Sequence, residues 1–214
     1  MRTLFVSGSD TNVGKTWVVG AIAQHLSAQG ATVQVVKPIE SGVCGGAESD
    51  VAQVLEGCSG GLVKGYTLRS YSKPIAPVAA AEYEGEDLDF SEIESSITSL
   101  PADVDWRIIE GAGSLATPLS NDGRDWLDLA VILKVQALVL VVEDRVGAIG
   151  QARLVYEYAN SKDLNCGVWL NEIEPQESLG KTGTLNGIQN LKIPIWGMTQ
   201  SGQLDLCFGE RGWL

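Results

Sequence analysis

The sequence has one histidine, His25, and four cysteines, and no two of the cysteines are spaced as CxxC. A single histidine excludes most histidine-based chemistry, and nothing near His25 suggests a catalytic triad. The cysteine spacing favours reduced thiols over disulfides or zinc ligands. The sequence also starts without a signal-peptide pattern, and its longest apolar runs are far too short to span a bilayer. We therefore expect a cytoplasmic protein with no membrane partner.

Positive charge is scarce as well, since 15 lysines and arginines stand against 27 aspartates and glutamates, for a net charge of -12 at pH 7. This balance argues against a nucleic-acid partner, because a broad nucleic-acid surface needs clustered basic residues. A small anionic ligand is still compatible with it, because a local pocket can be positive on an acidic protein. The length of 214 residues and the hydrophobic content of 44% favour one large domain over residues 1–214.

Short apolar runs alternate with helical patterns along the chain. This alternation predicts an α/β fold with a doubly wound, mainly parallel sheet flanked by helices. Ligands of such sheets bind at the carboxyl ends of the strands, so the residues that follow each strand are the candidates for a site. Pro74 and Pro77 predict an extended, irregular connection over residues 57–87. We expect strands at 3–7, 31–37, 106–110, 136–142, 165–170 and 193–196, and helices at 16–29, 50–55, 90–100, 125–134, 149–160 and 177–190.

The stretch GSDTNVGKT at residues 8–16 lies between the first strand and the first helix. It differs by one position from the phosphate-loop pattern GxxxxGK[ST], because five residues rather than four separate Gly8 from Gly14. In such a loop, backbone N–H groups and the helix N-terminus receive phosphate oxygens. Lys15 would add a positive charge at the β- and γ-phosphates, and the Thr16 hydroxyl would bind Mg²⁺. The motif predicts a P-loop NTPase-like protein, and the alternative is a glycine-rich turn without a ligand.

Three charged residues follow other strands at the same edge of the predicted sheet. Lys37 ends the second strand and would point at the same cleft, although a solvated lysine fits that position equally well. Glu110 precedes Gly111-Ala112-Gly113 and is placed like a Walker-B carboxylate, which holds Mg²⁺ directly or through water. A solvated or helix-capping glutamate is the alternative. Asp50 is a second candidate carboxylate, and alone it reads as a helix N-cap.

Two further stretches follow the remaining strands. Residues 147–150 open a helix, and their free N–H groups could bind a carboxylate or a phosphate. Asn171 follows the strand at 165–170, and its amide could both donate to and accept from a base edge. The sequence has no NKxD motif, so guanine recognition is unsupported.

These motifs, in this order, resemble the dethiobiotin synthetase family over residues 3–171. The matching pieces are GSDTNVGKT, KPIESG, the ESD around Asp50, EGAGSLATPLS and VWLN at 168–171. The family's own phosphate loop has the same five-residue gap before GKT. The resemblance implies an ATP-dependent cyclo-ligase of biotin biosynthesis, with ATP as co-substrate and Mg²⁺ as cofactor. It closes a cyclic urea on 7,8-diaminononanoate with CO2, through a carbamate and a carbamic–phosphoric anhydride, and releases dethiobiotin, ADP and phosphate.

The resemblance also implies a role for each matching residue. Lys37 binds the carbamate and γ-phosphate oxygens, Thr11 lies near the transferred group, and Ser41 lies near the nitrogen end of the substrate. Lys37, Lys15 and Thr11 are the expected catalytic residues, and Thr16, Asp50 and Glu110 the expected metal ligands. The expected nucleotide-binding set is Asn12, Val13, Gly14, Lys15, Thr16, Trp17, Asp50, Glu110 and Asn171, and the expected substrate-binding set is Ser41, Lys37, Gly113, Gly147, Ala148, Ile149 and Gly150.

By the same resemblance the protein is a homodimer, and residues 147–150 of the neighbouring subunit bind the substrate carboxylate. Three positions depart from the family pattern. Asn12 replaces a frequent acid, Gly150 replaces an amide side chain found in some members, and WGMTQSG replaces a Gly-x-x-Pro segment near the base. The first removes a charge near the reacting centre, and the second leaves tail binding to backbone N–H groups.

Two other functions are compatible with the phosphate loop. A related P-loop ligase or amidotransferase-type synthetase acting on a carboxylate would use the same Lys15, Thr16 and Glu110. The KPIESG and TPL stretches count against it. A ParA- or MinD-like switch ATPase would carry a lysine early in the loop, and residues 8–12 contain none.

Overall fold

The computed structural model describes residues 1–43, 49–173, 178–200 and 203–205. Its described strands form an eight-stranded sheet in the order β10-β9-β8-β7-β1-β6-β2-β4, and a small parallel pair, β3 and β5, lies apart from it. Neighbours in the large sheet are parallel, except that β10 is antiparallel to β9. The strands are β1 (Arg2–Gly8), β2 (Val33–Lys37), β3 (Glu40–Ser41), β4 (Val63–Thr67), β5 (Ser70–Tyr71), β6 (Trp106–Glu110), β7 (Ala137–Glu143), β8 (Cys166–Asn171), β9 (Ile195–Gln200) and β10 (Gln203–Asp205).

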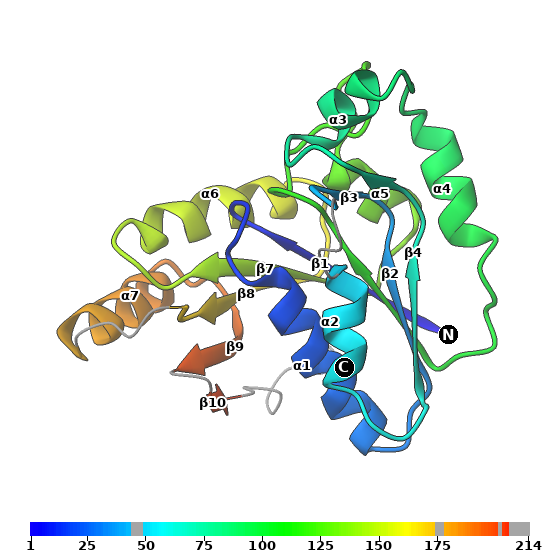
Figure 1. The fold of residues 1–214 in the computed structure, drawn as a ribbon. Helices are drawn as coiled ribbons and strands as arrows, with labels where there is room; N and C mark the ends of the chain where they lie inside the picture. The colour runs from blue at the N-terminus through cyan, green and yellow to red at the C-terminus, as the bar shows by residue number, and fades with distance from the viewer. Residues whose placement is uncertain (44–48, 174–177, 201–202, 206–214) are drawn as a thin grey trace.

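Helices cover both faces of the large sheet (Figure 1). Helices α1 and α2 share one apolar cluster with the sheet, and the helices α3 to α7 contribute to a second cluster on the opposite face. The helices are α1 (Lys15–Ala28), α2 (Asp50–Glu56), α3 (Pro77–Tyr83), α4 (Phe90–Thr98), α5 (Trp126–Ile132), α6 (Ala148–Asn160) and α7 (Ser178–Asn190). The predicted α/β fold with a doubly wound, mainly parallel sheet is therefore confirmed.

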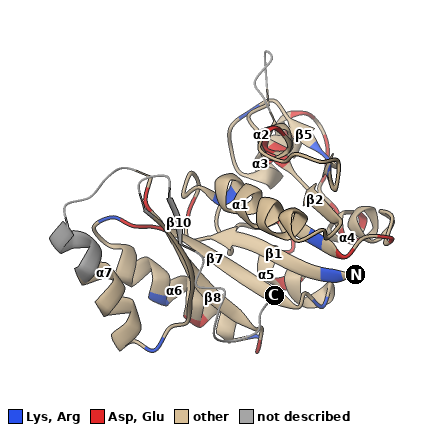
Figure 2. Cartoon of the chain, turned by 90° about the horizontal axis from the view of Figure 1, so that it is seen from below, with Lys and Arg blue, Asp and Glu red and all other residues tan. Residues whose placement is uncertain are grey.

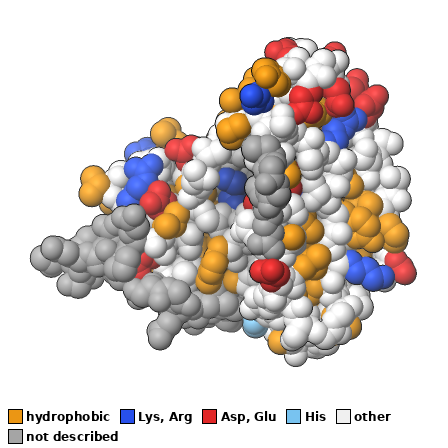
Figure 3. Space-filling view, viewed as in Figure 1, with side chains coloured by type: hydrophobic (Ala, Val, Ile, Leu, Met, Phe, Trp, Pro, Cys, Tyr) orange, Lys and Arg blue, Asp and Glu red, His pale blue; other side chains and the backbone are white. Residues whose placement is uncertain are grey.

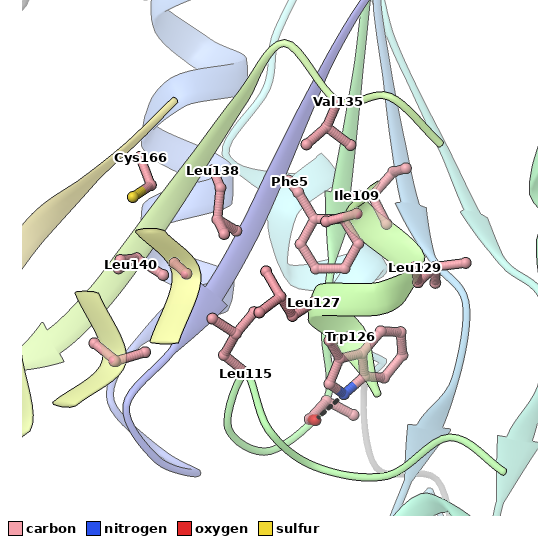
Figure 4. Packing of buried hydrophobic residues seen from close by; sticks show 14 of the residues in the cluster. Phe5, Ile109, Leu115, Trp126, Leu127, Leu129, Val135, Leu138, Leu140 and Cys166 are labelled. Carbon is pink, nitrogen blue, oxygen red and sulfur yellow. Dashed lines mark hydrogen bonds between the residues drawn. The ribbon is translucent and has the colours of Figure 1, made fainter. Parts of the chain in front are cut away.

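The core explains why the central strands read as continuous apolar runs. In β1, Leu4 and Val6 face the α1 side, whereas Phe5 faces the opposite cluster, and all three side chains are fully buried. Figure 4 shows Phe5 among residues of β6, α5 and β7. In a parallel strand that is covered on both faces, as β1 is, apolar residues occur at successive positions and not only at alternate ones.

The sequence placed most elements to within a few residues, and the strand at 106–110 was placed without error. The prediction of an irregular connection over 57–87 was wrong, because this stretch contains β4, β5 and α3. Pro77 does not prevent the helix, since it lies in the first turn of α3, where its missing N–H costs nothing. The strand predicted at 193–196 corresponds to β9. Its prediction as the last strand of the chain was wrong, because β10 follows it.

The start of α2 differs in detail from the sequence-based prediction. Ser49 is the N-cap of α2, and its Oγ accepts a hydrogen bond from the Ala52 N–H at 3.1 Å. Asp50 is therefore the first residue of the helix, and its carboxylate is not used as the cap.

Cys58 and Cys166 are free thiols in the described part of the chain. Cys44 and Cys207 lie outside the described residues. Residue 177, at the start of the predicted helix 177–190, and residues 201–202, at the end of WGMTQSG, also lie outside them.

Lys and Arg are scattered among Asp and Glu over the described chain (Figure 2). Exposed hydrophobic side chains form small separate groups on the face shown in Figure 3. Within the described ranges, no helix is both long enough and apolar enough to cross a membrane.

Trp126 fixes the loop that follows β6. Its indole is fully buried, and Nε1 donates a hydrogen bond of 2.6 Å to the Ala112 carbonyl oxygen (Figure 4). A side chain on Gly111 would meet the same indole, because its Cβ would lie 3.3 Å from the ring. The contact holds Glu110 and the glycines after it against the first turn of α5, which Asp125 caps through a capping box.

We predict that Trp126→Phe lowers the free energy of unfolding by about 2 kcal/mol or more. The variant leaves the Ala112 carbonyl without its donor and opens a cavity, and each defect costs on the order of 1 kcal/mol or more. Urea unfolding followed by circular dichroism measures the change. A loss below about 0.5 kcal/mol would show that the loop does not depend on this contact.

Candidate active site

A cavity of about 630 Å³ opens at the carboxyl ends of the central strands. The loop after β1, the start of α2, the loop after β6 and the end of β8 all contribute to its wall. Twelve residues of the predicted site meet here: Thr11, Asn12, Gly14, Lys15, Thr16, Trp17, Lys37, Ser41, Asp50, Glu110, Gly113 and Asn171. Glu40, Gln53, Ala112, Glu172, Ile173 and Thr199 also line the cavity, and the sequence reading did not single them out.

The loop between β1 and α1 has the backbone of an anion site. Gly14 is the N-cap of α1 with φ of 86°, and no described side chain caps the helix N–H groups. These first N–H groups of a helix are free to receive an anion. Asn12 also has a positive φ, 58°, which asparagine tolerates better than most residues.

Asn171 holds this loop from the end of β8. Its Nδ2 donates a hydrogen bond of 2.9 Å to the Val13 carbonyl oxygen, and the side chain lies directly against Gly14. A Cβ on Gly14 would overlap the Asn171 amide, so this position requires glycine both for φ and for space. The Val13 side chain does not line the cavity; it is buried in the apolar cluster beneath the loop.

Lys15 is 6% exposed, and its Nζ donates a hydrogen bond of 2.8 Å to the Asp10 carbonyl oxygen. Burial, followed by the charge of Lys37, lowers the pKa of Lys15 from 10.5 to about 8. The described protein groups around Lys15 therefore leave its charge incompletely compensated. An anion bound at the loop would supply the missing negative charge.

Lys37 lies between two carboxylates, with Nζ 2.5 Å from Glu110 Oε1 and 2.5 Å from Asp50 Oδ2. Lys37 is only 4% exposed and Glu110 only 2%. Lys37 therefore lies inside the cleft and is not a solvated lysine. Burial alone lowers the pKa of a lysine, but the pairs with Glu110 and Asp50 outweigh it and raise the pKa of Lys37. The cavity therefore keeps an ammonium group beside the phosphate loop.

Thr16, Asp50 and Glu110 provide oxygen atoms of the kind that Mg²⁺ prefers. The Thr16 hydroxyl donates a hydrogen bond of 2.9 Å to Glu110 Oε1, and Lys37 connects Glu110 to Asp50. The described residues contain no group of three or more His, Cys, Asp or Glu side chains that could hold a metal by themselves. These three residues therefore fit an ion that takes its remaining ligands from phosphate oxygens and water.

Glu40 is 6% exposed and was missed in the sequence, where KPIESG drew attention to Lys37 and Ser41. Its Oε1 accepts a hydrogen bond of 2.6 Å from the Asp50 N–H at the start of α2. Its Oε2 is buried and has no hydrogen-bond partner among the described residues. Burial raises the pKa of Glu40 above its ordinary value, and the bond from Asp50 offsets this only in part.

The end of the cavity near β8 and β9 combines apolar and polar groups. Trp17 and Ile173 are partly exposed at its edge, while Asn171, Glu172 and Thr199 are buried. The Trp169 Nε1 donates a hydrogen bond of 3.1 Å to the Thr199 hydroxyl. Thr199 lies on β9, within the WGMTQSG stretch that the family resemblance places near the base, although no single residue of this stretch was predicted to line the site.

The predicted substrate residues 147–150 do not line the cavity of their own chain. Gly147 is the N-cap of α6 with φ of 96°, and Ala148 and Ile149 begin the helix. Val146, immediately before them, is 93% exposed, and Leu154 in the same helix is 75% exposed.

Comparison with known proteins agrees with this geometry. The model of a family described as "AAA domain" matches residues 2–195. The chain is 34% identical over 197 residues to "ATP-dependent dethiobiotin synthetase BioD" of Nitrosospira multiformis, covering 91% of this chain and 86% of the relative. It is also 34% identical over 200 residues to the protein of the same name from Xanthomonas campestris pv. campestris, covering 90% and 88%.

Solved structures show the same fold at low identity. The MinC:MinD cell division protein complex of Aquifex aeolicus matches with a TM-score of 0.55 and 18% identity, covering 94% of this chain and 81% of that chain. A putative plasmid partition protein of Borrelia burgdorferi bound to AMPPNP matches with a TM-score of 0.57 and 12% identity, covering 97% and 92%.

The parallel sheet, the loop between β1 and α1 and these structural matches define a P-loop NTPase fold. Within this class, the chain belongs to the family of ATP-dependent dethiobiotin synthetases, since it matches named members over most of their length. The family resemblance seen in the sequence is therefore confirmed.

We predict that Lys15→Met raises the free energy of unfolding at pH 7 by about 1–3 kcal/mol. A lysine pKa lowered from 10.5 to about 8 means that folding disfavours the charged side chain, and methionine removes this cost. Between pH 8 and 10.5 the unfolded chain binds more protons at Lys15 than the folded one, so wild-type stability rises with pH. The gain from Lys15→Met should therefore shrink in this window.

Urea unfolding without nucleotide, at pH 7 and pH 9.5, measures this gain. Lys64→Met is the control, because Lys64 is an exposed lysine on β4. A gain for Lys15→Met that does not change with pH, or a loss of stability at pH 7, would contradict the prediction.

Proposed function

We propose that the protein catalyses the ATP-dependent carboxylation and ring closure of 7,8-diaminononanoate with CO2 to dethiobiotin, in biotin biosynthesis. The observation that carries this proposal is the buried ammonium of Lys37, which lies between the phosphate loop and two carboxylates at the carboxyl end of β2. The curated relatives are named ATP-dependent dethiobiotin synthetases, which supports the same reaction.

The reaction needs three bond-forming steps. One amine of the substrate attacks CO2 and loses a proton to give a carbamate. A carbamate oxygen then attacks the γ-phosphorus of ATP, ADP leaves, and a carbamic–phosphoric anhydride results. The second amine attacks the carbamoyl carbon, and phosphate leaves as the cyclic urea closes. No histidine base is required, because the nucleophiles are amines and CO2 is already electrophilic.

The residues of the cavity are suited to the phosphoryl-transfer step, which depends mostly on positioning and charge neutralisation. The free N–H groups at the start of α1 and the ammonium of Lys15 bind the phosphate oxygens. Lys37 donates to the carbamate and to the γ-phosphate, which places the two reacting groups on one cation. Thr11 lies in the loop beside the transferred group, and Ser41 and Gly113 line the substrate side.

Thr16, Asp50 and Glu110 are the residues that would hold Mg²⁺. When bound, the ion offsets the negative charge of the β- and γ-phosphates. In the structure, Lys37 shares Glu110 Oε1 with the Thr16 hydroxyl, so the same oxygen is already positioned by both groups.

The adenine base binds at the β8 end of the cavity. Asn171 uses one amide N–H on the Val13 carbonyl oxygen, and its Oδ1 and second N–H can pair with the adenine edge. Trp17 and Ile173 are exposed at this end and provide apolar surface for the faces of the base. Asn12 and Val13 contribute backbone groups of the phosphate loop.

The active protein is a homodimer in which Gly147, Ala148, Ile149 and Gly150 of one subunit bind the substrate carboxylate in the other. Two observations support this arrangement: the segment does not line the cavity of its own chain, and Val146 and Leu154 expose apolar side chains beside it. We place the protein in the cytoplasm, and the free thiols of Cys58 and Cys166 are consistent with that reducing compartment.

A switch ATPase is the less favoured function. The likeness to MinD concerns the fold alone, at 18% identity, and residues 8–12 provide no lysine that could reach a partner subunit. A synthetase should hydrolyse ATP in response to its small substrate and not to a macromolecule.

We predict that phosphate release from MgATP requires both 7,8-diaminononanoate and bicarbonate, and that labelled carbon enters the product in equal amount. Lys37→Ala should lower kcat by at least about a hundredfold, because it removes the cation shared by the carbamate and the γ-phosphate. Phosphate assays and carbon counting measure the two outputs. ATP turnover that ignores the diamine would contradict the proposed function.

We predict that Leu154→Glu converts the dimer to monomers and raises the KM for the diamine about tenfold or more, while ATP binding is retained. A charge at this position would have to be buried in the subunit contact. Light scattering and kinetics measure both effects. Ile132→Glu, at an exposed apolar residue ending α5, is the control and should leave the dimer intact. A Leu154→Glu protein that remains dimeric would exclude this surface as the interface.

A further inference from the structure

Glu40 has two oxygen atoms in different situations. Oε1 accepts the Asp50 N–H at 2.6 Å and so holds the first turn of α2. Oε2 is buried and has no hydrogen-bond partner among the described residues, and Glu40 is one of the residues that line the cavity. A buried carboxylate oxygen without a donor is costly, so such an oxygen on a residue of the cavity lining points to a ligand that brings the donor.

The charges around Glu40 define the chemistry of that donor. The charges that act on Glu40 are the carboxylates of Asp50 and Glu110 and the ammonium of Lys37, and Lys15 lines the same cavity. Lys37 already contacts Asp50 and Glu110 at 2.5 Å each, which leaves Glu40 without an ammonium partner of its own. A donor that carries positive charge, or an amine N–H, is therefore favoured over a neutral hydroxyl.

We propose that Glu40 Oε2 binds one of the two amino groups of the diamine substrate and so determines the placement of the nitrogen end beside Lys37. This inference rests on the proposed function, because the diamine is the substrate assigned there. Glu40 precedes Ser41, which lines the same cavity, and both lie on β3 directly after Lys37 and β2. The carboxylate that holds α2 in place thus also binds the amine.

Two substitutions separate the amine contact from the contact that holds α2. In Glu40→Gln the amide oxygen can still accept the Asp50 N–H, while an NH2 donor replaces Oε2 in the cavity. Glu40→Ala removes both acceptors. Glu56→Gln is the matched control, since it makes the same charge change at the exposed end of α2.

Kinetics with the diamine and with ATP give the first comparison. Glu40→Gln should raise the KM for the diamine about tenfold to a hundredfold, the range of a lost hydrogen bond to a charged group, and leave the KM for ATP within about twofold. Glu40→Ala should raise both values, and Glu56→Gln neither. An unchanged diamine KM in Glu40→Gln, or equal increases for the diamine and ATP, would overturn the inference.

Calorimetric binding of the diamine without ATP gives a second comparison that does not require turnover. Weaker binding of the diamine to Glu40→Gln than to wild type supports the role of Glu40. This conclusion holds even if wild type shows no diamine-dependent phosphate release; that absence of release would reject the proposed function alone. Normal wild-type turnover with equal binding to both proteins would reject the role of Glu40 alone. A wild-type protein that neither binds the diamine nor turns it over would reject both.

Discussion

The ion pairs of Lys37 with Asp50 and Glu110 join three parts of the chain at the centre of the site. Burying a lysine without partners would cost several kcal/mol, so the ammonium can stay in the cavity only because both carboxylates are within 2.5 Å. Glu110 in turn accepts the hydroxyl of Thr16, and Glu40 fixes the backbone of Asp50. The phosphate loop, β2, α2 and β6 are therefore positioned by one connected set of charges, which the described sheet brings together by placing β6 between β1 and β2.

Much of this arrangement could be predicted from local patterns. The apolar runs identified the central strands, and the loop before Lys15 together with Glu110 and Asn171 identified the edge of the sheet to inspect. Residues 57–87 could not be predicted in the same way, because β4 is only half buried and lacks a continuous apolar run such as that of β7. Glu40 was missed for a different reason: only the three-dimensional structure shows that its Oε2 is buried and unpaired.

The same fold serves proteins with other tasks, and the difference lies in a few residues. The MinD match covers 94% of this chain, so the sheet and its helices do not define the reaction. The residues that line the cavity carry the difference we propose, namely Lys37 at the end of β2, Glu40 on β3 and a phosphate loop that is one residue longer than the common pattern. Asn12 has a positive φ within that loop. By the family resemblance an acid is frequent at this position, so the change to asparagine affects the fit to the backbone conformation as well as the charge.

The hydrogen bond from Asn171 to Val13 connects residues 158 positions apart in the sequence. The phosphate loop is made from the first residues of the chain, yet the side chain that holds it arrives only when β8 has paired with β7. Contacts at such sequence separation slow folding, because the entropy of closing the intervening chain must be paid before the contact is gained. A nascent chain that has completed β1, α1 and β2 would therefore still have an unsettled loop, and the capacity to bind a nucleotide would appear only when the sheet is nearly complete.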